Sequence, residues 1–246
     1  MKSASPGIER IFSWSAIDSK SRVFILVCTL LICTIPHSSG QETITGWGEA
    51  ESWTDKDLNS AVILGEIAWV FGDSGVVRFS QDSGATWQNH TSLGDANLIA
   101  ADSFGESIAV LSSEGVIYMK EGVDDEWGTI DSSQTGINSI ALTGEDSFVI
   151  VGNGGNIWQY IGETWWNRTT SFSENLYDID FNGDEDGLAV GDAGTILATA
   201  NGGATWDYRE SPDEDATIIS ISYFNPYRMF AVSDSGQILY STSPGG

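Results

Sequence analysis

From residue 43 onward, short runs of alternating apolar and polar residues are separated by polar turns that contain glycine. In the stretch 191–206, GDAGTILATANGGATW, a turn closed by Gly194 precedes the alternating run 195–199. A second turn, 201–203, leads into Trp206. Alternation over about five residues between such turns predicts strand, hairpin and strand. No part of this region keeps a period of about 3.6 residues, so we expect almost no helix.

The same unit recurs along the chain. Its turn glycine is found at Gly75, Gly115, Gly155, Gly194 and Gly236, in steps of 40, 40, 39 and 42 residues. Its aromatic residue is found at Trp87, Trp127, Trp166 and Trp206, in steps of 40, 39 and 40. A unit of about 40 residues cannot bury its own faces and needs neighbours like itself. The repeat therefore predicts an all-β propeller of four-stranded blades.

The two ends of the repeat predict how the ring closes. The expected blades cover residues 58–90, 97–130, 136–169, 175–209 and 216–246. The last unit contains no tryptophan strand, whereas the segment 43–50 around Trp47 precedes the first inner strand without a partner. Propellers protect their edges by closing the ring with strands from both termini. We therefore expect one domain over 41–246, with five blades, the last completed by 43–50.

Two units carry a recognisable hairpin motif of the form S/T-x-D-x-G-x-T-W. One fits it at Ser80, Asp82, Gly84, Thr86 and Trp87. The other fits it, with Asn in place of Asp, at Thr199, Asn201, Gly203, Thr205 and Trp206. These residues resemble the Asp-box (BNR-like) propellers, and especially the photosystem II stability/assembly-factor-like family. The resemblance spans roughly 43–246 and implies a fold more than a function.

In that family the acidic residue of the motif is structural, because its side chain caps the backbone amides of the turn. The resemblance implies this role for Asp82 and Asn201. The second and third units depart from the motif at 121–127 and 160–165, so it leaves their hairpins unassigned.

The repeat region is strongly acidic. The chain has 35 acidic and 10 basic residues, and residues 1–40 contain 2 of the acidic and 4 of the basic ones. Residues 41–246 therefore contain 33 acidic and 6 basic residues, a net charge of −27. Such a potential excludes nucleic acid as a partner held by charge. It suits a cationic partner, divalent ions or a saline medium, and general solubility in salt is the simplest interpretation.

The first 40 residues are different in kind. Basic residues precede an apolar run of thirteen residues, 23–35. This run is shorter than the roughly 20 residues that a membrane-spanning helix needs. Its length and its basic flank fit the core of a signal peptide. An uncleaved anchor stays open because the leading region is long. Lipidation of Cys33 is disfavoured, because Ile32 occupies a position that needs a small residue. Either route predicts a secreted or membrane-tethered propeller, and sequons at Asn89 and Asn167 agree with export.

Two sets of oxygen-bearing side chains are candidate sites. The turns between second and third strands carry Asp73, Ser113, Asn153, Asp192 and Asp234, which we expect on one face around the central channel. Turn formation explains Asp and Asn at these positions on its own. The second set, Asp180, Asn182, Asp184 and Asp186, resembles a calcium loop but lacks an acid at its twelfth position. Calcium is thus a possible ligand, and no other cofactor is expected.

No catalytic constellation stands out. The repeat-phased tryptophans suit packing between blades better than sugar stacking, which leaves Trp53, Trp158 and Trp165 as ligand candidates. The pair Asp178 and Asp180 suggests a glycosidase, but residues two apart share one strand face instead of flanking a substrate. The leading hypothesis is a monomeric, non-catalytic scaffold that binds a protein or glycan outside the cytoplasm. The alternative is a sialidase-like or other glycoside-acting enzyme with an acidic channel.

Overall fold

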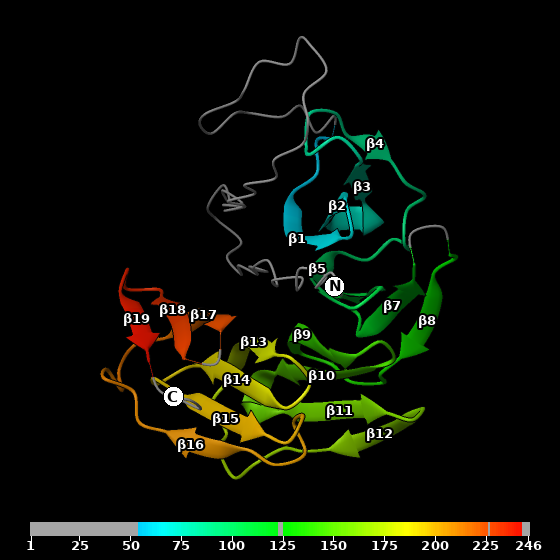
Figure 1. Ribbon diagram of the computed structural model, residues 1–246. Helices are drawn as coiled ribbons and strands as arrows, with labels where there is room; N and C mark the ends of the chain where they lie inside the picture. The colour runs from blue at the N-terminus through cyan, green and yellow to red at the C-terminus, as the bar shows by residue number, and fades with distance from the viewer. Residues whose placement is uncertain (1–53, 123–124, 226, 243–246) are drawn as a thin grey trace, which may run out of the picture.

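The computed structural model describes residues 54–122, 125–225 and 227–242, and shows five antiparallel sheets following one another around an arc (Figure 1). Each sheet is one blade, with its strands in chain order from the inside outward. The predicted all-β, five-bladed propeller is confirmed. In the described residues the only helical turns are 3-10 turns at Asp73–Gly75 and Asn153–Gly155. The described residues contain no helix that could cross a membrane.

Four blades have four strands. Blade one contains β1 (Leu58–Leu64), β2 (Ile67–Gly72), β3 (Val77–Ser80) and β4 (Gln88–Asn89). Blade two contains β5 (Leu98–Phe104), β6 (Ser107–Ser112), β7 (Val116–Glu121) and β8 (Gly128–Asp131). Blade three contains β9 (Ile137–Gly144), β10 (Ser147–Gly152), β11 (Ile157–Ile161) and β12 (Thr164–Asn167). Blade four contains β13 (Leu176–Asn182), β14 (Asp186–Gly191), β15 (Ile196–Ala200) and β16 (Asp207–Arg209).

Blade five has three strands in the described residues: β17 (Ile218–Asn225), β18 (Arg228–Ser233) and β19 (Ile238–Ser241). The segment 43–50, predicted to supply its fourth strand, lies outside the described residues. So does the apolar run 23–35. Blades one and five lie at the two ends of the arc (Figure 1).

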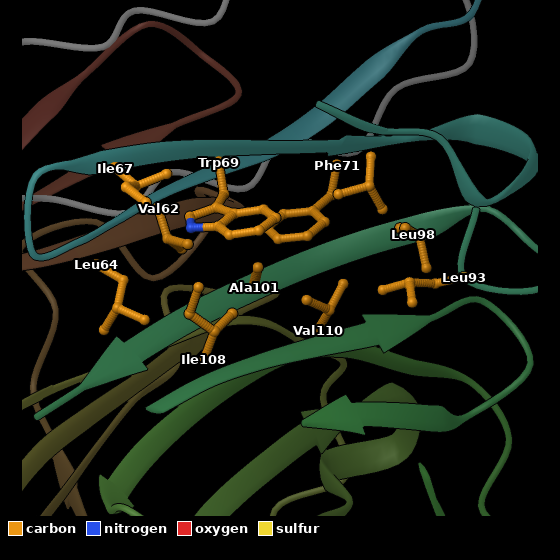
Figure 2. Packing of buried hydrophobic residues seen from close by; sticks show 11 residues of the cluster. Val62, Leu64, Ile67, Trp69, Phe71, Leu93, Leu98, Ala101, Ile108 and Val110 are labelled. Carbon is orange, nitrogen blue, oxygen red and sulfur yellow. The ribbon is translucent and has the colours of Figure 1, made fainter. Parts of the chain in front are cut away.

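The hydrophobic core lies between blades. Strand alternation gives every blade a forward face, which packs on the next blade, and a rear face, which packs on the previous one. On the forward face of blade one, Trp69 and Phe71 lie over Leu98, Ile108 and Val110 of blade two (Figure 2). The same arrangement joins blades two and three, three and four, and four and five. Stability therefore rests on neighbouring blades, as the short repeat requires.

The repeat glycines mark where one blade meets the connection to the next. Gly75, Gly115, Gly155 and Gly194 have φ between +63° and +82°. A Cβ on them would lie 2.1–2.5 Å from the carbonyl oxygens of Gly94, Gln134, Phe172 and Asp213, respectively. A side chain at these positions would thus be strained and would also collide with backbone.

One part of the tryptophan pattern is corrected by the strand register. In blades one, two and four, the residue that follows the repeat-phased tryptophan pairs with the fourth residue after the repeat glycine. These pairs are Gln88 with Phe79, Gly128 with Met119 and Asp207 with Ala198. In blade three the residue that obeys this rule is Trp165, because Trp166 itself pairs with Gln159. Trp165 packs edge-on against Phe148 and Tyr160, whereas Trp166 is 48% exposed. The nearly equal spacing of Trp166 was misleading because the hairpin of blade three is two residues shorter than those of blades one, two and four.

Candidate functional site

One end of the propeller, named here the turn face, carries the turns between second and third strands and the connections between blades. Its turns are at 73–75, 113–115, 153–155, 192–194 and 234–236, and its connections at 90–97, 132–136, 168–175 and 210–217. The opposite end carries the turns between first and second strands, at 65–66, 105–106, 145–146 and 183–185. The predicted ring of turn residues therefore shares one face.

Backbone hydrogen bonds fix these turns in the same way in every blade. The first turn residue donates its N–H to the carbonyl just before the inner strand of its own blade. The pairs are Asp73 to Asp57, Ser113 to Asn97, Asn153 to Gly136, Asp192 to Asn175 and Asp234 to Thr217, at 2.8–3.0 Å. Each turn is thus held against the start of the inner strand of its own blade.

Several turn side chains are committed to neighbouring segments. Asn59 donates to the Asp73 carboxylate at 2.9 Å and to the Leu98 carbonyl of blade two at 3.0 Å. Asn138 repeats this link between Asn153 and the Leu176 carbonyl of blade four. These asparagines join a turn to the next blade. The sequence analysis missed them, although an Asn as the second residue of the inner strand in blades one and three was a visible signal.

Asp192 is held by donors from two blades. Its carboxylate accepts hydrogen bonds from the Asn175 amide at 2.9 Å, the Tyr177 hydroxyl at 3.1 Å and the Thr217 hydroxyl at 3.3 Å. Burial, followed by the neighbouring carboxylate of Asp192, raises the pKa of Tyr177. Asp192 is therefore a structural hydrogen-bond acceptor, and its carboxylate also adds negative charge to the turn face.

Other acids on the turn face remain open to solvent. Asp95, Glu114, Glu214, Asp215 and Asp234 are exposed. Asp213 accepts a hydrogen bond from the Gln237 amide at 2.7 Å, and this bond lowers the pKa of its carboxyl. The turn face thus carries several solvent-exposed carboxyl groups.

The inner strands use buried or partly buried carboxylates to join blades. Asp102 of β5 accepts the Leu142 N–H of β9 at 2.8 Å. Asp180 of β13 accepts the Tyr223 N–H of β17 at 2.8 Å and its own neighbour's N–H at 2.8 Å. These bonds stabilise contacts between successive inner strands.

Asp178 joins three blades. One carboxylate oxygen accepts the Ser139 hydroxyl of blade three at 2.9 Å, and the other accepts the Ser220 hydroxyl and the Ile221 N–H of blade five at 2.8 and 2.9 Å. Burial raises the pKa of Asp178 to about 6, against the effect of these hydrogen bonds. A carboxylate enclosed in this way has no access to a glycosidic bond, so the pair with Asp180 is not built for hydrolysis.

The two motif hairpins show nearly the same hydrogen bonds. Asp82 accepts the Thr86 N–H at 2.8 Å and the Thr86 hydroxyl at 2.6 Å, and the Ser80 hydroxyl accepts the Gly84 N–H at 2.8 Å. Bonds from Thr86 and Ser80 lower the pKa of Asp82.

In blade four, Asn201 accepts the Thr205 N–H at 2.9 Å, donates to the Thr205 hydroxyl at 2.8 Å, and Thr199 accepts the Gly203 N–H at 3.0 Å. The amide oxygen thus replaces one carboxylate oxygen. The motif closes the hairpin in both blades.

The four possible calcium ligands do not gather around a point. Asp180 directs both oxygens to backbone N–H groups, while Asn182 and Asp186 pair across the β13–β14 hairpin. In the part of the chain that the structure describes, no three His, Cys, Asp or Glu side chains are placed to hold a metal ion together. Calcium here stays a prediction.

The remaining candidates occupy different surroundings. Asn89 and Asn167 are exposed on the outermost strands of blades one and three, where an attached glycan would meet solvent. Trp158 and Trp165 pack into the core of blades two and three, so neither is a ligand platform. Trp53 lies outside the described residues.

Known proteins support the predicted resemblance. The family described as photosynthesis system II assembly factor YCF48 matches residues 159–246. The photosystem II assembly lipoprotein Ycf48 of Picosynechococcus sp. is 26% identical over 188 residues, which cover 70% of this chain and 54% of that protein. The chain therefore spans about half the length of this curated relative.

Two solved structures share the fold. A structure described as YCF48 bound to D1 peptide has a TM-score of 0.65 and 19% identity, over 81% of this chain and 68% of its own. YCF48 from Cyanidioschyzon merolae has a TM-score of 0.58 and 17% identity, and the match covers 78% of this chain and 68% of that protein. The resemblance carried by the Asp boxes is confirmed, and this chain is similar in sequence and in fold to the Ycf48-type photosystem II assembly factors.

Proposed function

We propose that this protein is a non-catalytic scaffold outside the cytoplasm that holds a segment of a partner protein on its turn face. The observation that carries the proposal is the shared fold with a propeller described as bound to a peptide. The relative's printed name calls it an assembly lipoprotein, which supports a tethered, extracytoplasmic protein. The apolar run 23–35 would supply the export signal or the tether.

The chemistry of the turn face indicates what kind of segment it would take. Exposed acids surround the turns, and the repeat region carries a net charge of −27. A cationic, extended segment would gain long-range attraction and faster association from this potential. A glycan partner has less support, because Trp158 and Trp165, two of the tryptophans that the sequence analysis offered as ligand candidates, pack against the core.

A matched pair of charge variants tests the proposal. The turn-face variant replaces Asp95, Glu114, Glu214 and Asp215 by their amides, and the control replaces Glu106, Glu145, Asp146 and Glu185 at the opposite end. Both remove four exposed charges. The tagged proteins are used to capture partners from the native envelope, and captured segments are mapped by cross-linking.

We expect the turn-face variant to lose the partner at least tenfold, while the control keeps it. Equal loss in both variants would mean that the partner responds to net charge and not to this face. Hydrolysis of glycosides by the wild-type protein, lost on Asp178→Asn, would overturn the non-catalytic proposal.

A further inference from the structure

Blade three carries an exposed tryptophan at a position where the other four-stranded blades carry no aromatic residue. Trp166 on β12 pairs with Gln159 on β11, and its side chain is 48% exposed. The residues in the same register on the other outermost strands are also exposed, and they are Gln88, Gly128 and Asp207. Packing between blades therefore does not require an aromatic side chain here, because glutamine, glycine and aspartate occupy the same place elsewhere.

The strand partner of Trp166 departs from the repeat in the opposite direction. Gln159 is polar but only 5% exposed. Its counterparts in the other four-stranded blades are apolar, and they are Phe79, Met119 and Ala198. A buried amide is costly unless its hydrogen bonds are made. Gln159 donates through Nε2 to the Gly202 carbonyl of blade four at 2.7 Å, and its Oε1 accepts from Nε of Arg168 at 3.0 Å. The buried amide thus holds an arginine in place.

Arg168 and Trp166 form a stacked pair at the outermost strand of blade three (Figure 1). The guanidinium carbon of Arg168 lies 5.2 Å from the centre of a Trp166 ring. This contact and the hydrogen bond through Nε fix the plane of the guanidinium group. Within the described residues, these two contacts are the ones that the side chain makes. Its two Nη groups therefore form a planar fork of donors that no described residue occupies.

The surface beside the stacked pair is apolar. Ile161 and Thr164 form the next cross-strand pair on the same sheet face as Gln159 and Trp166. Ile161 is 48% exposed, and Thr164 is exposed as well. One face of the outer hairpin thus presents an aliphatic side chain, a hydroxyl, an indole and a guanidinium group to solvent. This combination of a flat apolar surface with a few fixed polar groups is typical of ligand sites.

We propose that Trp166 and Arg168 bind a sugar acid, namely a hexuronate residue at the end of an otherwise neutral glycan. The indole stacks on the C–H face of the sugar ring, and the Nη fork donates two parallel hydrogen bonds to the carboxylate. The repeat region has a net charge of −27, which repels a chain with many acids. A single carboxylate on a neutral chain satisfies the guanidinium and keeps this repulsion small. The site adds a ligand to the proposed function, because none of the exposed turn-face acids belongs to it.

A rigid ligand suits this open site better than the end of a peptide. In a hexuronate the ring holds the carboxylate in a fixed place beside the apolar C–H face, so both contacts form with little further ordering of the ligand. A peptide C-terminus brings the same carboxylate on a flexible chain, and ordering that chain over an open surface costs binding free energy. The proposal therefore commits to the sugar, and a peptide carboxylate becomes an outcome of the test.

Three small molecules test the ligand class on the full chain at neutral pH. Methyl glucuronide and methyl glucoside share one ring and differ only in a carboxylate against a hydroxymethyl group, while N-acetyl-leucine brings a carboxylate without a sugar. Titrations followed by NMR of the indole N–H signals measure binding. We expect methyl glucuronide to bind at least tenfold more tightly than either of the others. Equal binding of the glucoside, equal binding of N-acetyl-leucine, or no binding of the glucuronide would each overturn the proposal.

Two variants and a matched control locate the site. Trp166→Gln introduces the residue that blade one has at this place, so the fold is kept while the stacking surface is lost. Arg168→Lys keeps the positive charge and removes the planar fork. The control is Arg209→Lys, because Arg209 has the same register in blade four.

We expect Trp166→Gln and Arg168→Lys each to weaken the binding of methyl glucuronide at least tenfold, with the melting temperature of Trp166→Gln close to that of wild type. The control should bind like wild type. Glucuronide binding that survives in either variant, or that is lost equally in the control, would overturn the proposal. Capture of a protein partner by the turn face is a separate measurement, so failure here leaves the proposed function standing.

Discussion

Two aspartates at opposite extremes of the propeller make similar hydrogen bonds and respond to them in opposite ways. Asp82 lies on an outer hairpin, and bonds from Thr86 and Ser80 lower the pKa of its carboxyl. Asp178 lies on an inner strand, and burial raises its pKa to about 6 although hydroxyl and N–H groups of three blades surround it. On the inner wall, the loss of solvation outweighs the hydrogen bonds.

The difference separates two kinds of acid in this protein. Exposed carboxyl groups on hairpins and turns remain in contact with solvent and add to the negative potential of the surface. Buried carboxylates on inner strands join blades and contribute to the ring itself. The proposed binding of a cationic segment therefore depends on the exposed acids of the turn face and not on the buried acids of the inner strands.

Removing the inner carboxylate should have the largest effect. Asp178→Ala leaves the hydroxyls of Ser139 and Ser220 and the N–H of Ile221 without this acceptor. Each buried donor left unsatisfied costs about 1–3 kcal/mol, so we expect the free energy of unfolding to fall by about 3 kcal/mol or more. Urea denaturation measures it, with Asp82→Ala as the matched control. A loss no larger than that of the control would contradict the role assigned to the inner wall.

The second prediction concerns pH. The pKa of Asp178 is about 6 in the folded protein and 3.8 otherwise, so between these values the folded state binds more protons. The contribution of Asp178 to the free energy of unfolding therefore falls by about 3 kcal/mol as the pH rises from about 4 to about 6, and it is constant above that pH. Asp82 acts oppositely, because its lowered pKa gives stability that is present above pH 3.8 and lost as pH falls further.

The measurement is the difference in unfolding free energy between wild type and Asp178→Asn from pH 4 to 7.5. General charge repulsion is shared by both proteins and cancels. A difference that does not change with pH would show that Asp178 titrates alike in the folded and unfolded chains.

The architecture could be predicted because the repeat is local. Spacing of glycines and tryptophans, with short alternating runs, is enough to place five blades, and the Asp-box pattern identifies its own hairpin. The packing partner of each tryptophan could not be predicted in the same way. Trp165, and not the evenly spaced Trp166, enters the core, because the hairpin of blade three is two residues shorter than in the other blades.

The candidate site was less accessible to sequence reasoning. The turn residues were found, but Asn59 and Asn138, which bond to them, also donate to the Leu98 and Leu176 carbonyls of the next blade, and a pattern along the chain does not show such contacts. The role of Asp178 was also invisible, since its donors Ser139 and Ser220 lie 39 and 42 residues away. Contacts at a distance of one repeat require the ring geometry.

A smaller effect is expected where the two motif hairpins are exchanged. Asp82→Asn should mimic Asn201, which keeps the oxygen for the Thr205 N–H and turns its amide to the Thr205 hydroxyl. We expect Asp82→Asn to lower the melting temperature clearly less than Asp82→Ala, which removes the cap of the turn. Thermal melts of the two variants check it. Equal losses would mean that the charge, and not the hydrogen-bonded oxygen, closes the hairpin.

The smallest effect concerns salt, which should act on the exposed acids and leave Asp178 unchanged. Sodium chloride screens repulsion among surface carboxylates, so the melting temperature should rise with ionic strength, by the same amount in wild type and in Asp178→Asn. Calcium at equal ionic strength should add little, because Asp180 directs its oxygens to the N–H groups of Phe181 and Tyr223. A specific site would add stabilisation by ligand linkage. If millimolar calcium raises the melting temperature beyond matched sodium chloride, and Asp184→Asn removes the excess, the loop 180–186 binds calcium and the screening interpretation is wrong.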